Sequence, residues 1–311
     1  MRYILLWILF SSSLALAQTS FMERDLDGNG RLTLLESGLS AEEFARLDES
    51  GNGELSLGEF EDHWTRIAPA PDLRDAPYGR ESSRQVLDLY LPVEPSDQMP
   101  LFLWIHGGSW REGDKQACPF QTFTRHGIAV ASLNYRFIDK ARFPAQLDDC
   151  QSALDFLQEE ARRRGFQFDR ITACGLSAGG QLSLMMAARG LVDNAIAFGA
   201  PVDLTHPGGR ERFRKNLELL AGSPLEEHLE TLKAASPLFN LGPRTMRYLL
   251  IHGTGDRTIP YQQSQQMAAA LAEHGVTVEL ILQAGGAHTV VGGPVVWNRL
   301  LALLKDVNGK K

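Results

Sequence analysis

The residues best suited to chemistry lie around Ser177, in the stretch Ile171 to Ala188, "ITACGLSAGGQLSLMMAA". A short apolar run ends at Gly175, and the glycines beside Ser177 fit a tight turn from a strand into a helix. The helix that follows would point its N-terminus at the serine and stabilise negative charge there. A serine in this position predicts a nucleophile, whereas the bland alternative is a plain glycine-rich turn.

An acid and a base follow in the chain. Asp256 lies just beyond the apolar run of "LIHGTGDRTIP", and His288 lies in "QAGGAHTVVGG" after the next run. Serine is a poor nucleophile unless a neighbouring base removes its proton, and a carboxylate can hold that base in the right tautomer. We therefore expect a triad of Ser177, Asp256 and His288, in the chain order that a strand-to-helix elbow requires. Asp203 in "APVDL" is the rival acid, because it also follows a strand.

Donors for an oxyanion are expected in "LWIHGGSW", where an apolar strand ends at His106. Gly107 and Gly108 leave backbone N–H groups uncovered. The expected donors are Ala178 N–H together with Gly108 or Ser109 N–H. The alternative is a tight turn without a catalytic role. Trp110 would line a substrate pocket, or would be a half-buried packing residue.

Taken together, residues from about 78 onward resemble the esterase/lipase family of α/β-hydrolases. The motifs that carry the resemblance are "HGGSWREGDK", "LNYRF", "FPAQLDDCQSAL", "GLSAGGQL" and "HGTGDRTIPYQQS". The resemblance implies carboxylic ester hydrolysis without a cofactor, in a branch that contains acetyl-xylan and feruloyl esterases. It also implies that Arg136 and Asp149 form a structural ion pair.

The elements that must position these residues alternate between strands and helices. Apolar, strand-like runs occupy residues 85–91, 101–106, 128–134, 171–175, 195–200, 247–252 and 277–282. Amphipathic helices are expected between them, for example over 145–164 and 263–274. This alternation predicts an α/β fold with a mostly parallel sheet and helices on both faces. Residues 203–244 are expected to form a helical lid over the carboxyl edge of the sheet.

A smaller module precedes this domain, at residues 18–65, and a linker is expected at 66–77. It holds two stretches, "DLDGNGRLTLLE" and "DESGNGELSLGE", with the spacing of EF-hand calcium loops. Leu32 and Leu55 should pair the loops as a short β-bridge, and a short helix should bury Phe44 and Leu47. The expected ligands are Asp25, Asp27, Asn29, the Arg31 carbonyl, Thr33 and Glu36 in the first loop, and Asp48, Ser50, Asn52, the Glu54 carbonyl, Ser56 and Glu59 in the second. Calcium is expected to be structural.

Charge and targeting signals support this division. Residues 18–65 hold 12 acidic and 3 basic side chains, whereas residues 66–311 hold 26 and 27. No basic patch for nucleic acid is expected.

Residues 1–17 have a positive start, an apolar run and a small-x-small end, which predicts a signal peptide, export, and no membrane association after cleavage. Three cysteines allow one disulfide at most and leave a thiol over.

These features predict an exported serine esterase, acting on small-acyl or polysaccharide esters and carrying a structural calcium module. One alternative is a serine peptidase, because "HGTGDRTIPYQQS" also resembles the prolyl-oligopeptidase catalytic domain. The short segment ahead of the hydrolase region argues against the propeller that gates those peptidases. Another alternative is a calcium-dependent binding protein with an inactive hydrolase fold, which an intact triad argues against.

Overall fold

The computed structural model of the chain describes residues 24, 31–37, 39, 41–48, 50–56, 59, 69–206, 211, 213–243, 245–289 and 294–305. The chain divides into two compact units. The larger unit spans residues 70–291 and 298–311, and the smaller one spans residues 1–69 and 292–297. Residues 1–17, the expected signal peptide, lie outside the described residues.

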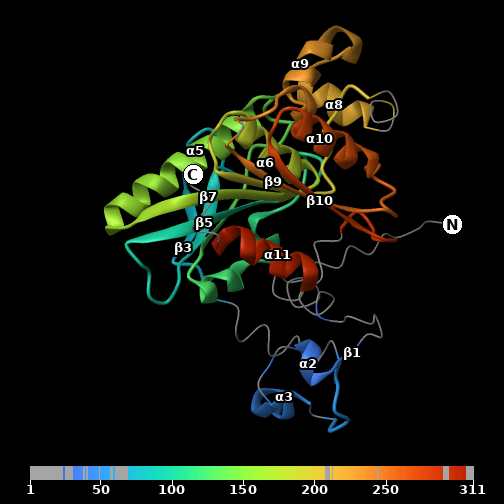
Figure 1. Cartoon of the computed structure of the whole chain (residues 1–311). Coiled ribbons are helices and arrows are strands. Elements are labelled where there is room, and N and C mark those ends of the chain that lie inside the picture. Colours follow the sequence, from blue (N-terminus) through green and yellow to red (C-terminus); the bar gives the residue numbers. More distant parts are fainter. Residues whose placement is uncertain are drawn as a thin grey trace, which may run out of the picture. The chain divides into compact units, whose positions relative to one another are not determined.

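A mostly parallel sheet of eight strands forms the centre of the larger unit (Figure 1). Its strands lie in the order β10-β9-β8-β7-β5-β6-β4-β3. The first six of these pair in parallel, and β4 and β3 pair antiparallel at one edge. The strands are β3 (Leu73–Pro77), β4 (Val86–Tyr90), β5 (Gln98–Ile105), β6 (Ala129–Leu133), β7 (Gln167–Leu176), β8 (Asn194–Phe198), β9 (Arg247–Gly253) and β10 (Thr277–Gln283). The predicted α/β fold and all seven expected strands are confirmed.

The prediction of a linker at residues 66–77 was wrong for its second half, because Leu73–Pro77 form strand β3. The proline content of this segment favoured an irregular connection, but proline is compatible with an edge strand because no neighbour needs its missing N–H there. Strand β3 has one neighbour, β4, with Leu73 opposite Leu89. The larger unit therefore begins earlier in the chain than the expected boundary at residue 78.

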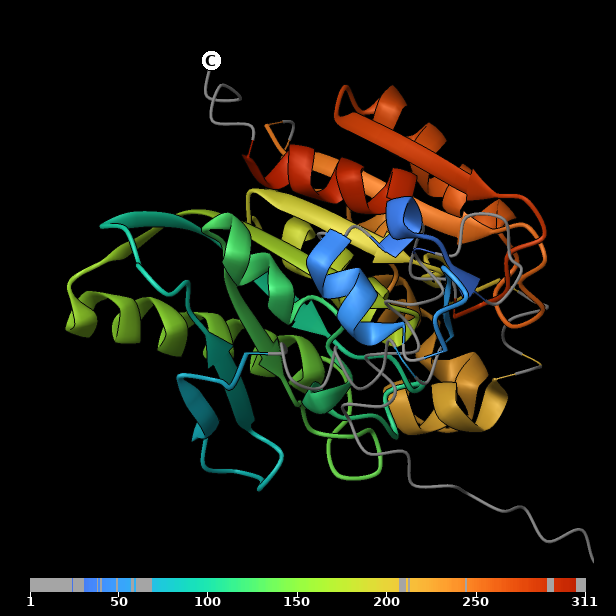
Figure 2. The same ribbon diagram turned by 90° about the horizontal axis from the view of Figure 1, so that it is seen from below.

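Helices cover the sheet on both faces, as the sequence pattern predicts. Helices α5 (Ala145–Arg164), α6 (Ala178–Ala188) and α10 (Gln262–Glu273) lie on one face, and α11 (Pro294–Lys305) lies on the other (Figures 1 and 2). Short 3-10 turns η1 (Lys115–Ala117) and η2 (Gln121–His126) connect β5 to β6. Among the described residues, none of the helices has the length and apolar character needed to cross a bilayer.

Side chains of β5 alternate between two cores because successive strand residues point to opposite faces. Leu101 and Leu103 belong to the aliphatic core that also contains buried residues of α5 and α6. Phe102 packs edge-on against Phe120 and Phe123, with ring centroids 4.9 and 5.2 Å away. The strand is therefore packed on both faces of the sheet.

The segment expected to form a lid, residues 203–244, is largely helical in its described part. It contains α8 (Arg214–Ala221), η3 (Leu225–His228), α9 (Leu229–Ala234) and η4 (Pro237–Phe239). Helix α8 buries Leu217 and Leu220. The residues 207–210, 212 and 244 of this segment lie outside the description.

The smaller unit contains α2 (Leu34–Ser37), α3 (Ala41–Leu47) and two short strands, β1 (Arg31–Leu32) and β2 (Leu55–Ser56). The strands pair antiparallel with Leu32 opposite Leu55, so the expected pairing of the two loops is confirmed. Phe44 and Leu47 are buried on α3, also as expected. Asp25, Asp27 and Asn29 of the first loop lie outside the described residues.

Candidate active site

Ser177 connects the end of β7 to the first turn of α6. Its φ of 54° and ψ of −119° are unusual for a residue with a side chain, and such a conformation costs roughly 1–3 kcal/mol. The Ser177 N–H donates to the Phe198 carbonyl at 2.8 Å, which ties the elbow to the end of the neighbouring strand. Strain held by the surrounding structure presents the hydroxyl at the carboxyl edge of the sheet.

The glycines around Ser177 are required by close packing. A Cβ atom on Gly175 would lie 2.3 Å from the Gly179 carbonyl carbon, and one on Gly179 would lie 2.0 Å from the Ile105 carbonyl oxygen. Neither distance is sterically allowed. The spacing Gly-x-Ser-x-Gly therefore follows from how tightly α6 approaches β7 and β5.

Asp256 and His288 meet at the same edge of the sheet. Asp256 follows β9, His288 follows β10, and the His288 Nδ1 lies 2.6 Å from the Asp256 Oδ2. The two loops pack closely, because Gly255 N–H donates to the Gly286 carbonyl at 2.9 Å and a Cβ on Gly253 would lie 2.1 Å from that oxygen. The fold thus brings an acid and a base 32 residues apart into direct contact.

The Asp256 carboxylate is fully buried yet stabilised in its ionised form. Burial raises its pKa, but hydrogen bonds from His288 and from the backbone N–H groups of Ile259 and Thr258 outweigh burial and hold the pKa below its usual value. The two amides donate to Oδ1 at 2.9 and 2.7 Å. A carboxylate fixed by this many donors can orient an imidazole and offset its charge.

Ser177 and His288 both lie next to the end of β8. A Cβ on Gly199 would lie 3.3 Å from the His288 Nδ1 and 3.4 Å from the Asp256 Oδ2. Phe198, the residue before Gly199, accepts the hydrogen bond from the Ser177 N–H. Within the described residues, no hydrogen bond joins the Ser177 hydroxyl to His288. Catalytic hydrogen bonds are often long in unliganded enzymes and shorten when substrate binds.

The rival acid, Asp203, is engaged elsewhere. Its Oδ1 accepts hydrogen bonds from the N–H and the hydroxyl of Thr205, at 2.8 and 2.6 Å. It lines the pocket beside Ser177, whereas the carboxylate that contacts His288 belongs to Asp256.

Three of the expected oxyanion residues, Gly107, Ser109 and Ala178, lie beside Ser177 or line its pocket. A Cβ on Gly107 would lie 3.4 Å from the Ser177 Cβ, and one on Gly108, where φ is +105°, would lie 2.2 Å from the Glu112 carbonyl oxygen. Ser109 and Ala178 line the same pocket as Ser177. Ala178 is the first residue of α6, where backbone N–H groups have no partner within the helix. These N–H groups are therefore suited to bind an oxyanion.

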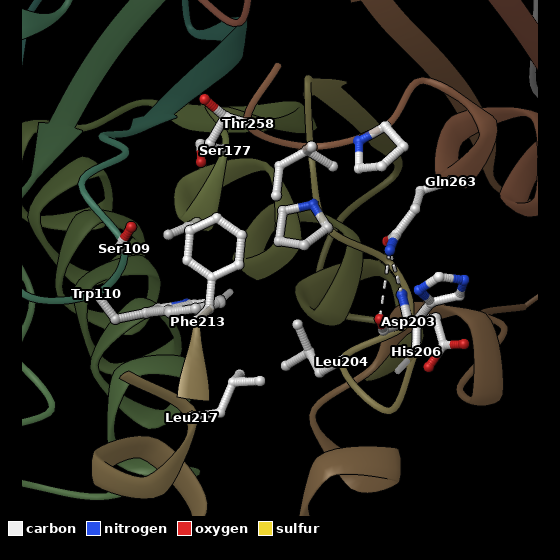
Figure 3. A pocket seen from close by; sticks show the side chains of 14 residues that line it. Ser109, Trp110, Ser177, Asp203, Leu204, His206, Phe213, Leu217, Thr258 and Gln263 are labelled. Atoms are coloured by element: carbon white, nitrogen blue, oxygen red, sulfur yellow. Dashed lines mark hydrogen bonds between the residues drawn. The ribbon is translucent and has the colours of Figure 1, made fainter. Parts of the chain in front are cut away.

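A cavity of about 220 Å³ opens beside Ser177 (Figure 3). Trp110, Phe213 and Leu217 lie on one side of it, Asp203, His206 and Gln263 lie on the other, and Leu204 lies beside Asp203 and His206. Leu204, Phe213 and Leu217 come from the segment that sequence reasoning identified as a lid.

Trp110 is a packing residue, more buried than expected, that also borders the cavity. Its side chain is 5% exposed and its Nε1–H donates to the Gln181 Oε1 at 3.0 Å, so it packs as a buried residue. It also lines the cavity. Its φ of 59° shows that the turn after Gly108 is unusually tight.

His252 is a neighbour of Asp256 that sequence reasoning missed. It lies near the end of β9, and its Nε2 lies 3.0 Å from the Ile259 carbonyl oxygen. The same Nε2 also lies 3.1 Å from the Asp256 Oδ2. The spacing of four residues between the histidine and the aspartate, across a tight turn after the strand, was the available signal.

Other expected contacts are structural. His106 is buried with its Nδ1 2.7 Å from the Gly107 carbonyl oxygen, and burial lowers its pKa to about 4. Arg136 and Asp149 form an ion pair at 2.8 Å. All three cysteines, Cys118, Cys150 and Cys174, are free and buried.

In the second calcium-type loop, the expected ligand residues converge. Asp48 Oδ1 accepts from the Ser50 hydroxyl at 3.0 Å, and Glu59 Oε2 accepts from the Ser56 hydroxyl at 2.6 Å. Glu59 Oε1 accepts from the Ser50 N–H at 3.2 Å, which links the two ends of the loop. Asn52 accepts the Glu54 N–H at 2.8 Å. These oxygens are of the kind that Ca²⁺ prefers.

In the first loop, Glu36 Oε2 accepts from both the N–H and the hydroxyl of Thr33. This repeats the contact between Ser56 and Glu59. Within the described residues, no cluster of three or more His, Cys, Asp or Glu side chains suited to a metal is present. Two of the expected ligands in the second loop are carboxylates, Asp48 and Glu59, and the others are oxygens of Ser, Asn and the backbone.

Comparisons with known proteins relate the chain to esterases. Residues 87–271, more than half of the chain, match the family model BD-FAE. A probable isoprenylcysteine alpha-carbonyl methylesterase of Oryza sativa subsp. japonica is 27% identical over 70% of this chain and 58% of its own length. Esterase LipQ of Mycobacterium tuberculosis is 25% identical over 70% of this chain and 57% of its own length. The chain therefore spans less than two thirds of these curated relatives.

A solved structure has the same fold. A truncated carbohydrate esterase from gut microbiota superposes with a TM-score of 0.67 at 21% identity, over 76% of this chain and 98% of that one. At this identity the likeness shows the α/β-hydrolase fold alone.

Proposed function

Because the chain belongs to the BD-FAE family and has an α/β-hydrolase fold, we propose that it is an exported serine carboxylesterase. The observation that carries the proposal is the contact of 2.6 Å between Asp256 and His288 at the sheet edge where the strained Ser177 lies. The substrates proposed are small-acyl or carbohydrate esters. The esterase names of the relatives support this choice.

In the proposed reaction, each of these residues has one role. His288 removes the hydroxyl proton of Ser177 as the oxygen attacks the ester carbonyl carbon. The N–H groups of Ala178 and of Gly108 or Ser109 stabilise the resulting oxyanion, at roughly 10²–10³ in rate for each donor. His288 then protonates the leaving alcohol, and an acyl-enzyme on Ser177 remains. Water, activated by the same histidine, attacks the acyl carbon and releases the acid and the free serine.

The cavity is proposed to take the acyl group. The leaving alcohol must face His288 to receive its proton, and among the described residues His288 does not line the cavity that Ser177 borders. On the cavity's other side, the Gln263 Oε1 already accepts hydrogen bonds from the N–H groups of Val202 and Asp203, so this oxygen is engaged within the protein. The cavity is smaller than the roughly 300–1,000 Å³ of typical ligand pockets, which suits a short acyl group rather than a sugar.

Hydrolysis of p-nitrophenyl acetate, butyrate and octanoate tests the proposal. We expect the protein to hydrolyse acetate and the Ser177→Ala variant to lose at least 10³-fold in kcat, on the order of the loss for an isolated nucleophile. Equal inactivity of both proteins on all esters and on acetylated oligosaccharides would overturn the reaction class. Cleavage of a prolyl peptide instead would identify a peptidase.

The N-terminal unit is proposed to be a pair of EF-hand loops that bind Ca²⁺ for structure. The residues that would hold the ion in the second loop are Asp48, Ser50, Asn52, Ser56 and Glu59, with the Glu54 carbonyl, and the convergence of their oxygens supports the proposal. Bound calcium supplies positive charge that offsets the acidity of this segment. None of the catalytic steps above requires it.

Export is proposed from the residue pattern of positions 1–17. Its test is N-terminal sequencing of the protein recovered outside the cytoplasm after expression in a bacterial host. We expect Gln18 as the first residue. Recovery of uncleaved protein in the cytosolic fraction would contradict the proposal.

A further inference from the structure

A second histidine contacts the acid of the proposed triad. His252 lies on β9, one residue before its end, and its side chain and that of Asp256 are both fully buried. The His252 Nε2 lies 3.1 Å from the Asp256 Oδ2 and 3.0 Å from the Ile259 carbonyl oxygen. The Asp256 Oδ2 is therefore shared by two imidazole rings, since His288 contacts the same atom.

These neighbours determine which nitrogen of His252 carries the proton. A carboxylate and a carbonyl can only accept hydrogen bonds, so the Nε2 that faces both must be the donor. The Nδ1 lies 2.7 Å from the hydroxyl of Ser264, which is buried on α10. A hydroxyl can donate, so a neutral ring with its proton on Nε2 satisfies every contact.

Burial also favours the neutral ring. It lowers the pKa of His252, and the Ile259 carbonyl and Asp256, which raise the pKa, do not offset this. Asp256 and His288 are the titratable groups that act on it in the described part of the chain. A neutral His252 leaves the negative charge of Asp256 available to the other imidazole, whereas a charged ring would compete for it.

We propose that His252 is a positioning residue, which donates its Nε2–H to Asp256 and is held in that tautomer by Ser264. The proposal rests on the esterase function proposed above. Asp256 then has four donors: two backbone amides at Oδ1, and His252 and His288 at Oδ2. Oδ2 is aimed at His288 by the contact from the opposite ring.

Loss of the His252 donor should be visible in the kinetics. We expect His252→Met to lower kcat about 10- to 100-fold with little change in KM, because a misplaced orienting group affects the chemical step and not substrate binding. The acidic limb of the kcat/KM profile should move to higher pH. A carboxylate with one donor fewer attracts the imidazolium more strongly. His252→Gln, which can place an N–H near the position of Nε2, should recover part of kcat and move the limb back.

Two controls separate positioning from folding. Thr172→Val removes a buried acceptor that lies 3.0 Å from the Asn194 amide nitrogen, away from the site, and should lower Tm without changing kcat. Ser264→Ala removes the hydroxyl that sets the tautomer and should lower kcat less than His252→Met. If His252→Met is folded and keeps kcat within twofold with an unmoved pH profile, the residue only fills space and the proposal fails.

Nuclear magnetic resonance of the unmodified protein tests the tautomer without any substrate. In protein labelled with ¹⁵N-histidine, we expect His252 to show a protonated Nε2 and an unprotonated Nδ1 between pH 6 and pH 8, with His252→Gln giving the assignment. The opposite tautomer, or a ring that becomes charged in this range, would overturn the proposal. Failure of all ester assays with the expected tautomer present would refute the esterase function and leave the contact to Asp256 standing.

Discussion

At the scale of single residues, the candidate site depends on side chains in conformations or environments that are costly elsewhere. Ser177 has a positive φ, and Asp256 is an ionised carboxylate with no exposed surface. An unpaired buried carboxylate would take up a proton, because burial disfavours its charge. The donors around Asp256 reverse this tendency. These donors thus keep Asp256 negatively charged beside His288.

The pH dependence of stability follows from the lowered pKa of Asp256. Because the pKa is lower in the folded than in the unfolded chain, its contribution to stability is fully present above about pH 4 and is lost as pH falls through the folded-state value. We expect the native protein to exceed Asp256→Asn in free energy of unfolding at pH 7, since the amide nitrogen of asparagine cannot accept from His252 or His288. The difference should shrink between pH 4 and pH 2 in urea titrations. A difference that stays constant over this range would contradict it.

At the scale of elements, the strand ends could be predicted but the contacts between loops could not. The apolar runs and their order identified the sheet, the elbow and the residues that follow β9 and β10. The pairing of His252 with Asp256, and the strand at Leu73–Pro77, depend on tertiary neighbours. Periodicity reports which face of an element is buried, and it does not report which polar groups meet there.

A buried lysine links η1 to the two antiparallel strands β3 and β4 at one edge of the sheet. Lys115 of η1 is 2% exposed, and its Nζ lies 2.8 Å from both Asp88 of β4 and Asp75 of β3. Burial lowers its pKa, but the hydrogen bonds to Asp75 and Asp88 outweigh burial and raise it. We expect Lys115→Met to reduce the free energy of unfolding by about 3–5 kcal/mol, because it leaves the Asp88 carboxylate buried without a counter-charge.

The matched control for this ion pair is Asp75→Asn. Asp75 is 63% exposed, so loss of its charge should cost only about 0–1 kcal/mol. Both values can be measured by urea unfolding at pH 7. Equal effects of the two substitutions would show that the loss of stability in Lys115→Met does not come from leaving Asp88 buried without a counter-charge.

Helix α8 should set the acyl preference. Leu217 lines the cavity and is 2% exposed, so Leu217→Ala should enlarge the space beside Ser177. We expect the ratio of kcat/KM for octanoate to that for acetate to rise several-fold, because each further buried CH₂ contributes about 0.8 kcal/mol. Leu220→Ala is the control, since Leu220 is equally buried on α8 and does not line the cavity. The same rise in both variants would mean that loosening of the helix, and not cavity volume, changes the preference.

At the scale of the whole molecule, the chain contains two units of different chemistry. The larger one has a nearly balanced charge and the proposed catalytic residues, and the smaller one has most of the excess acidity. The sequence was sufficient to predict the pairing of Leu32 with Leu55, because the apolar residues of the two stretches stand at a fixed position in the EF-hand spacing. It was not sufficient to predict whether calcium changes catalysis, since that depends on how the units communicate.

Removal of calcium should therefore separate stability from turnover. At a hundredfold excess over Kd, binding to the folded unit alone stabilises it by about 2.7 kcal/mol, so EDTA should lower its Tm. Loops of the weak extracellular class bind with Kd on the order of 10⁻⁴–10⁻³ M.

We expect Glu59→Gln to weaken calcium binding at least tenfold in calorimetry, because Glu59 occupies the last proposed ligand position. Glu54→Gln should bind normally, since only the carbonyl of Glu54 is a proposed ligand and its side chain pairs with Arg31 at 3.6 Å. Ester turnover should change less than twofold in EDTA, because the triad uses no metal. Loss of turnover in EDTA with an intact circular-dichroism spectrum would show instead that the calcium loops act on the active site.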